Sequence, residues 1–452
     1  MSFDVLPAYG AFAILAAALF WRLPVRVAIL VVFFGGWLVL PVGAYPPVAA
    51  DVIFPWWIMG TGLPGDMLVT KAWVVPLVCL VWATVFDGSA WRGLRPGWCD
   101  ALMALWCLWP LAGGLWVGQA SPAPLTGTLY VTASWGGCWL LGRVWFSTAE
   151  SQLLFVKACA WSGVACLPVA LLEGVWGGSA YQLLYDTHPF RLEGRARYVA
   201  FRPVGMFEHG NQYGIWVALA AFAALWLALA RPRQGSGLLY VALALVCTVI
   251  AFAAQSVGSL LLLLAGLVGV AVWRWRGTFT VLVAGGCCVA ALLALHLSGV
   301  VPVRWIAEET GIGRAILQGF KSLGRGSFPG RIAMDLRVMG LVRDTLVAGT
   351  MTWDWWRPAE VRPWGLWLLL IGQFGVVGCL MAYGSLVAPA LRAVYRLRGL
   401  WGWGRENVAL ILGFIVVLAL ADSLLNDFLY FPAWLAAGAV ASAQTSVQRR
   451  AK

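Results

Sequence analysis

Long apolar runs alternate with short polar segments along almost the whole chain. A transmembrane helix needs about 20 predominantly apolar residues, so this pattern predicts twelve or thirteen membrane-spanning helices. The runs lie at residues 8–21, 25–43, 70–86, 99–117, 125–142, 152–172, 211–230, 237–254, 257–273, 278–297, 364–388, 407–427 and 428–445. The segment 407–445 also fits one span followed by a re-entrant piece. The expected fold is an all-α integral membrane protein.

Composition supports this fold class. Hydrophobic residues make up 62% of the chain, charged residues only 11%, and the mean hydropathy is +0.83. Water-soluble domains carry about a quarter charged residues, so a soluble domain is excluded as the main body of the protein.

The basic residues of the short loops predict the orientation of the helices. Cytoplasmic loops of membrane proteins are enriched in Lys and Arg. Alternate short loops carry arginine, and the short loops between them (44–69, 118–124, 254–256 and 422–430) carry no Lys or Arg. The arginine-bearing loops, expected inside, lie around Arg22 and Arg26, Arg92 and Arg95, Arg143, Arg231 and Arg233, Arg274 and Arg276, and Arg392 to Arg405. The N-terminus lacks the basic region of a cleavable signal, so the first helix is expected to be retained and to enter from outside.

This alternation divides the chain into five parts. Residues 1–172 are expected to form the N-terminal transmembrane helices and 211–297 the central ones. Residues 364–452 hold the C-terminal helices and a short cytoplasmic tail. The stretches 173–210 and 298–363 are expected to be two long outer loops. The run from Arg331 to Val347 in the second loop predicts a helix lying across the membrane face.

The two outer stretches are unusually basic. They contain thirteen of the thirty-one Lys and Arg residues, and only Lys321 among the thirteen is a lysine. Guanidinium groups bind phosphate oxygens in a bidentate way and keep their charge. These cations therefore favour an anionic ligand, such as a pyrophosphate leaving group, although arginine also exceeds lysine on the inner face. The candidate binding residues are Arg195, Arg197, Arg202, Arg331, Arg337, Arg343, Arg357 and Arg362.

Several other functions are excluded by what the chain lacks. The basic residues lie on two sides of a membrane and form no basic domain, so nucleic acid is not an expected partner. The ten cysteines lie in or beside apolar runs without Cys-x-x-Cys spacing, so neither a disulfide framework nor a metal site is expected. No cytoplasmic segment is long enough for a nucleotide-sugar-binding domain. The spans have few of the acidic or His residues typical of ion-coupled transporters.

Histidine and tryptophan supply further candidates. His209 precedes the apolar run at 211, and a histidine there is suited to act as general base towards a sugar hydroxyl. The alternative is a capping or solvated histidine at a helix start, with Asn211 as the N-cap. His188 and His296 fit structural positions better. Trp353 and Trp355 belong to a loop cluster that suits either sugar stacking or the membrane interface.

In its order of motifs, the region 200–440 resembles the superfamily of O-antigen ligases and O-antigen polymerases. The matching motifs are Arg202-Pro-Val-Gly205 to His209-Gly-Asn211 before a span, Ala254-Gln-Ser256-Val-Gly-Ser259, Gly330-Arg331-Ile332, Gly372-Gln-Phe-Gly375-Val-Val-Gly378, and Asp422 to Asn426 with Pro432.

The resemblance implies metal-independent glycosyl transfer without a cofactor, at the outer face of the bacterial inner membrane. The donor would be a glycan on undecaprenyl pyrophosphate. Arg202 and Arg331 would bind the diphosphate, and a base, here His209, would activate the acceptor hydroxyl. Membrane lipids are further partners, and a chain-length regulator is a candidate protein partner.

One departure bears on the choice within the superfamily. Its ligases carry a His-Asn pair near the end of the second outer loop, where this chain has Val361-Arg362-Pro363-Trp364-Gly365. This difference favours a polymerase that joins lipid-linked repeat units in O-antigen or exopolysaccharide biosynthesis. A ligase that transfers finished glycan to a lipid or protein acceptor, and a transporter of lipid-linked glycan, stay as alternatives.

Overall fold

The computed structural model describes most of the predicted spans. It covers residues 5–42, 61–62, 68–120, 122–185, 188, 199–230, 237–273, 291, 305, 308–322, 328–352, 355–356, 359, 361, 363–396 and 408–442. Helices account for nearly all of it. The exception is a short antiparallel pair, β1 (Thr61–Gly62) and β2 (Leu68–Val69), in which Thr61 pairs with Val69.

The first half of the chain forms helices at every predicted span. They are α1 (Val5–Arg22), α2 (Val25–Val39), α3 (Lys71–Phe86), the 3₁₀ turn η1 (Gly88–Gly93), α4 (Trp98–Trp116), α5 (Pro122–Val131), the π-helical turn η2 (Thr132–Gly136), α6 (Gly137–Trp145), α7 (Ala149–Ala165), α8 (Leu167–Val169), the π-helical turn η3 (Ala170–Val175) and α9 (Ala180–Leu184). The predicted span 125–142 corresponds to α5, η2 and α6 together, and 152–172 corresponds to α7, α8 and η3.

The second half adds the central and C-terminal helices. They are α10 (Gly210–Ala230), α11 (Gly237–Ala253), α12 (Val257–Trp273), α15 (Gly311–Ser322), α16 (Phe328–Val342), the 3₁₀ turn η4 (Arg343–Thr345), α17 (Leu366–Arg396), α18 (Val408–Ser423) and α19 (Pro432–Ala441). The predicted span 278–297 lies outside the described residues, apart from residue 291. The segment 407–445 forms two separate helices, α18 and α19.

Among the described residues, four helical segments are long and apolar enough to cross a membrane: Trp98–Trp116, Ala149–Val175, Gly210–Ala230 and Leu366–Arg396. The other apolar helices are shorter. Large apolar side chains such as Trp21, Leu238 and Leu380 point outward, as expected where lipid takes the place of water. These features support a helical membrane protein, whereas the span count and the orientation stay predictions.

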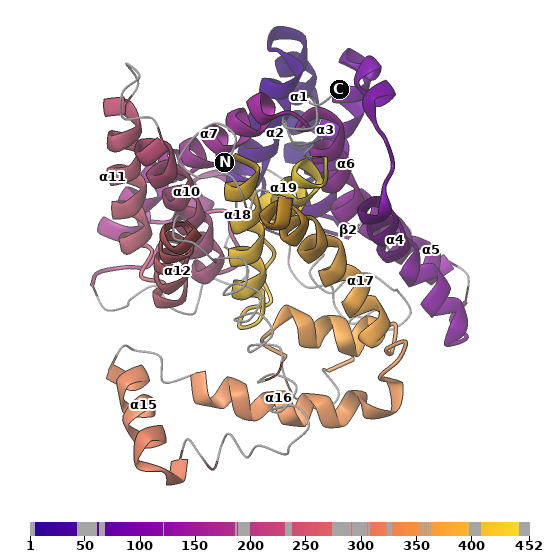
Figure 1. Cartoon of the computed structure of the whole chain (residues 1–452), viewed down its shortest axis with the longest axis vertical. Coiled ribbons are helices and arrows are strands. Elements are labelled where there is room, and N and C mark those ends of the chain that lie inside the picture. Colours follow the sequence, from indigo (N-terminus) through magenta and orange to yellow (C-terminus); the bar gives the residue numbers. More distant parts are fainter. Residues whose placement is uncertain are drawn as a thin grey trace.

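Helix α10 lies at the centre of one half of the molecule (Figure 1). It packs against α7, α11, α12 and α18, and most of its residues are buried. Its sequence explains this position, because apolar residues surround the helix on all sides and such a helix belongs inside a protein.

Helix α17 is broken at Gly375, and Figure 1 shows α17 bending sharply along its length. Gly375 has φ 70° and ψ 178°, a backbone conformation essentially restricted to glycine. After the break, residues 376–396 are long enough to cross the apolar layer, at about 1.5 Å per residue. The helix also continues to Arg396, beyond the predicted end at 388, so Arg392 and Arg396 lie in its last turns instead of a loop.

The segment 346–351 satisfies the backbone groups that the break exposes. The N–H groups of Thr350 and Met351 donate to the carbonyls of Gly372 and Gln373, at 2.9 and 2.8 Å. On the other side of the break, the N–H of Val376 donates to the carbonyl of Leu346 at 2.8 Å. The indole of Trp109 on α4 also donates, to the carbonyl of Phe374 at 2.7 Å. The backbone groups at the break in α17 are therefore hydrogen-bonded to two other parts of the chain, the segment 346–351 and helix α4.

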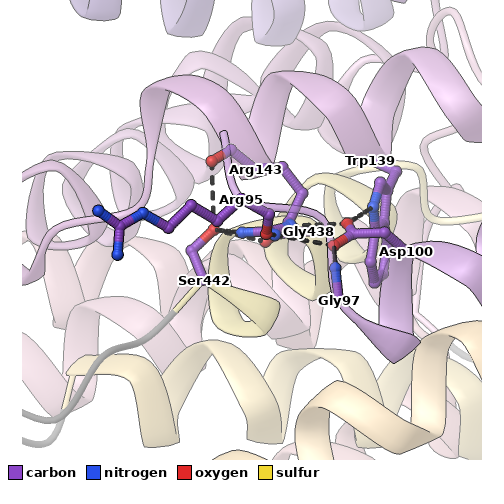
Figure 2. A network of polar contacts seen from close by, with 7 residues as sticks. All are labelled: Arg95, Gly97, Asp100, Trp139, Arg143, Gly438 and Ser442. Carbon is purple, nitrogen blue, oxygen red and sulfur yellow. Dashed lines mark hydrogen bonds and ion pairs between the residues drawn. The ribbon is translucent and has the colours of Figure 1, made fainter. Parts of the chain in front are cut away.

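At the opposite end of the bundle, one ion pair joins three helices (Figure 2). Arg143 on α6 contacts both carboxylate oxygens of Asp100 on α4, at 2.7 and 2.8 Å. It also donates to the hydroxyl of Ser442, just after α19, at 2.5 Å. Arg143 was expected in a basic loop, but its side chain is only 8% exposed, so it has a structural role as well.

We expect Gly375→Ala to lower the free energy of unfolding by about 3 kcal/mol, because the residue would adopt a glycine-only conformation. A Cβ at this position would also lie 2.0 Å from the carbonyl oxygen of Val347. Thermal unfolding in detergent measures the effect. The matched control is Gly384→Ala in the same helix, where a Cβ meets open space; it should be neutral or stabilising by up to about 1 kcal/mol. Equal effects of the two changes would contradict this account.

We expect Arg143→Met to destabilise the protein by about 2–3 kcal/mol, since it leaves the partly buried Asp100 carboxylate without its cation. The double variant Asp100→Asn/Arg143→Met should recover part of the loss, because no buried charge is then stranded. Arg92→Met, at an exposed arginine, is the control and should change stability by less than about 0.5 kcal/mol. Denaturant titration of the four proteins would disprove this role of the pair if Arg143→Met matched the control.

Candidate functional site

A network of buried polar side chains lies where α10 begins, α18 ends and α11 turns into α12. Arg202 is only 3% exposed. Its Nε donates to the carbonyl of Ala254 at 3.2 Å, and its Nη2 donates to Oδ1 of Asn211. Ala254 directly follows α11, whose carbonyl end carries partial negative charge that favours a cation. Gly210 makes room for the guanidinium, because a Cβ there would lie 2.4 Å from the Arg202 Nε.

Asn211 connects this arginine to two other helices. Its Nδ2 donates to Oδ1 of Asn426 at 3.1 Å, and Asn426 in turn donates to Oδ1 of Asp422 at 2.9 Å. The hydroxyl of Ser256 donates to Oδ1 of Asn211 at 3.4 Å and lies 2.9 Å from the hydroxyl of Ser259. The network therefore fixes both the position and the orientation of the Arg202 guanidinium.

The loop that carries Arg202 is folded around the buried carboxylate of Glu173 in η3. Oε2 of Glu173 accepts hydrogen bonds from the backbone N–H groups of Val204 and Gly205, at 2.7 and 2.9 Å. Its Oε1 accepts from the N–H of Ala180 at 2.8 Å. Gly205 has φ +59°, a left-handed conformation that glycine adopts without steric cost. One carboxylate thus organises the entry to α10.

His188 supports the same loop. Its Nε2 lies 2.8 Å from the carbonyl oxygen of Phe207, to which it must donate, and its ring packs edge-on against Tyr181. Burial lowers the pKa of this imidazole, which keeps it neutral. The structural role expected for His188 is consistent with these contacts.

His209 caps the start of α10 with its own ring. Nδ1 accepts a hydrogen bond from the backbone N–H of Asn211 at 3.0 Å, and the ring stacks on Phe428. The N-cap is therefore His209, and not Asn211 as expected. In the neutral ring the proton then lies on Nε2, so His209 presents a donor. To act as general base it must first release the cap.

A small pocket lies beside the network, between α2, α3, the start of α10 and the segment after α18. Its polar lining is Thr70, Lys71, Glu208, Gln212 and Asp427, and its apolar lining includes Trp37, Leu429 and Phe431. Its free volume of about 10 Å³ accommodates about one water molecule. The pocket places two carboxylates and one ammonium group within a small space.

The ammonium group belongs to Lys71, the first residue of α3. It donates to the carbonyls of Trp37 at 3.3 Å, of Leu40 at 3.4 Å and of Met206. The first two carbonyls lie at the C-terminal end of α2, where they lack partners within the helix. Lys71 therefore joins α2 to the loop that carries Arg202.

Comparison of the chain with known protein families, with curated proteins and with solved structures found no match. The likeness to O-antigen ligases and polymerases thus stays an expectation from sequence motifs.

The structure brings together part of the predicted site. Arg202, His209 and Asn211 lie within one network. Arg337 and Arg343 lie exposed on α16 and η4, and no described contact joins them to that network. Arg331 lies on α16, but its side chain is not among the described groups. The other candidates, Arg195, Arg197, Trp353, Arg357 and Arg362, lie outside the described residues.

Trp355 packs against protein in this structure. Its ring lies on Gly372, where a Cβ would meet it at 1.9 Å, and joins the apolar cluster between α16 and α17. Burial in the same region raises the pKa of Asp335 on α16 to about 7. Trp355 therefore packs between α16 and α17. These contacts are with protein, and they do not match the sugar-stacking role considered for this residue.

Sequence reasoning missed Lys71, Glu173, Glu208 and Asp427. Lys71 and Glu173 looked like ordinary residues at the edges of apolar runs. A charged residue at such an edge is a sequence signal, but its partners, such as Met206 or Val204, come from other segments. Only the folded chain identifies them.

We expect Glu173→Gln to destabilise the protein by about 1–3 kcal/mol, because the amide nitrogen replaces one acceptor and leaves a buried N–H unsatisfied. Protease cleavage within residues 199–209 should also accelerate. Thermal unfolding and timed proteolysis in detergent test both effects. Glu150→Gln, at an exposed position of α7, is the control; indistinguishable curves would rule out the proposed role of Glu173.

Proposed function

We propose that this protein is a membrane glycosyltransferase that joins undecaprenyl-pyrophosphate-linked oligosaccharide repeat units at the outer face of the bacterial inner membrane. It would act as a polymerase in O-antigen or exopolysaccharide biosynthesis. The observation that supports this proposal most is the Arg202 guanidinium, buried and oriented by the neutral oxygens of Ala254 and Asn211. A guanidinium whose orientation is fixed before the substrate binds is suited to stabilise a developing diphosphate charge.

The surroundings of Arg202 suit a lipid-linked donor. The network lies at helix ends, where a diphosphate headgroup can approach while its lipid stays in the apolar layer. Arg314, Lys321, Arg337 and Arg343 add exposed cations on α15, α16 and η4, within the second basic stretch. We assign diphosphate binding to Arg202 and Arg331, with Arg195, Arg197, Arg337, Arg343, Arg357 and Arg362 as further contacts.

The roles that we propose in proton transfer depend on which ring nitrogen of His209 carries the proton. With its Nδ1 engaged by the backbone, the neutral ring of His209 can donate only from Nε2, and we assign it that role towards a substrate oxygen. Glu208 and Asp427, which line the adjacent pocket, are then the carboxylates best suited to accept the proton of the acceptor hydroxyl. His209 acts as the base only if substrate binding displaces its cap.

A transporter of lipid-linked glycan is the second candidate, and the break in α17 is the observation in its favour. Transporters place the ends of broken helices at their substrate sites. Here, however, the groups at the break bond to the segment 346–351 and to Trp109. Because these protein partners occupy them, the break supports a transporter less than the polar network supports an enzyme.

We expect Arg202→Ala to reduce chain elongation by about 10²–10³-fold, the usual loss when one group that stabilises transition-state charge is removed. Arg202→Lys should also be impaired, because an ammonium cannot reproduce the two-directional guanidinium contacts. The measurement is the size distribution of carrier-linked glycan in a deletion strain that expresses each variant, with protein abundance in the membrane determined in parallel.

Arg92→Ala is the matched control and should elongate normally. Single repeat units accumulating on the carrier with Arg202→Ala, at normal protein abundance, support the polymerase. Long chains stranded on the carrier would instead identify a ligase. Normal elongation in the Arg202 variants would refute the role of this arginine, and turnover of donor by the purified protein would eliminate the transporter.

A further inference from the structure

Helix α15 has a sharply two-sided sequence, and among the described residues it is largely exposed. Figure 1 shows it apart from the main body of helices, near α16. Most of its described residues are exposed, including Ile312 at 77% and Ile316 at 53%. A large apolar side chain that the described part of the chain leaves exposed calls for another environment.

The residues of α15 separate cleanly around the helix axis. At 100° per residue, Ile312, Ala315, Ile316 and Leu317 fall on one side, together with Gly313 and Gly319. The opposite side carries Arg314, Gln318, Lys321 and Ser322. An apolar face opposite a cationic face is typical of helices that lie in the surface of a membrane.

The helix is well formed at its start. The hydroxyl of Thr310 accepts a hydrogen bond from the N–H of Gly313 at 2.9 Å, and the Thr310 carbonyl accepts from the N–H of Arg314 at 3.0 Å. Glu308 and Glu309 precede the positive end of the helix, and Lys321 lies in its last turn. Each charge matches the helix dipole, so the cap and the end charges both favour the helix.

The chain connection keeps α15 close to α16, which packs on the bundle. Val338 and Val342 of α16 pack against Trp367, Leu368 and Ile371 in the first part of α17, which lies at one end of the bundle. Only five residues separate Ser322 from Phe328, and six steps of at most about 3.5 Å each limit the gap to about 21 Å. A lipid surface therefore lies within reach of α15.

We propose that α15 binds the surface of an anionic lipid bilayer, with Ile312 and Ile316 in the apolar layer and Arg314 and Lys321 at the headgroups. The lipid is expected to be anionic because α15 carries two cations, and each cation strengthens binding to such a surface about fivefold. This inference does not depend on the reaction that the protein catalyses. It assigns to α15 the role of holding the second basic stretch on the membrane.

The test uses the full-length protein with a nitrobenzoxadiazole label at Ile316→Cys, in vesicles of phosphatidylcholine with or without phosphatidylglycerol. Gln318→Cys, on the polar face of the same helix, is the matched control. The described native cysteines are buried or partly buried, and unsubstituted protein labelled in parallel corrects for any that react. Quenching by spin-labelled lipid and the emission wavelength are measured at both positions.

We expect blue-shifted emission and strong lipid quenching at position 316, weak quenching at 318, and a larger difference when phosphatidylglycerol is present. Arg314→Gln/Lys321→Gln should remove most of that phosphatidylglycerol dependence. Equal quenching at the two positions would overturn the proposal. So would a blue shift at 316 without lipid quenching, because the apolar face would then be buried against protein, in this copy or a second one. Unchanged phosphatidylglycerol dependence in the double variant would overturn the role of the cations.

Discussion

The structure depends on how backbone groups at helix ends find partners in apolar surroundings. The first N–H groups and last carbonyls of a helix have no partner within it, and leaving them unsatisfied away from water is costly. Two buried cations serve carbonyl ends: Lys71 at the end of α2 and Arg202 just after α11. One buried carboxylate, Glu173, serves three N–H groups. These three residues tie separate helices to one loop.

The break in α17 follows the same rule at a point within a helix. Gly375 permits a conformation that interrupts the helical bonds, and the segment 346–351 supplies the missing donors and acceptors. Because this segment is continuous with α16 and η4, the second basic stretch is attached to the bundle by backbone hydrogen bonds. The apolar contacts of Trp355, Val338 and Val342 reinforce the attachment. Cations on α16 are thereby held at one end of the molecule.

Functional consequences follow from this division of labour among the cations. Lys71 donates to three carbonyls and so holds structure, whereas Arg202 is oriented by Asn211 and the Ala254 carbonyl at a junction of helix ends. Asn211 also links Arg202 to Asn426, and Asn426 bonds to Asp422. A ligand that displaces Asn211 from the guanidinium would therefore disturb the hydrogen bonds at the end of α18. A proton on Nδ1 of His209 would break the cap of α10, because Nδ1 accepts the hydrogen bond from the N–H of Asn211.

Sequence alone located most of the apolar helices that the structure describes, because lipid demands long apolar runs and few alternatives satisfy that demand. The predicted spans at 70–86 and 211–230 differ from α3 and α10 by a single residue at the start. Sequence also grouped Arg202, His209 and Asn211, since they are close along the chain. Only the tertiary structure shows the break at Gly375, the hydrogen bonds that join Lys71 to α2 and Met206, the pairing of Asn211 with Asn426, and the packing of Trp355. Each of these joins residues that are distant in sequence, and hydrophobic periodicity carries no information about which distant groups meet.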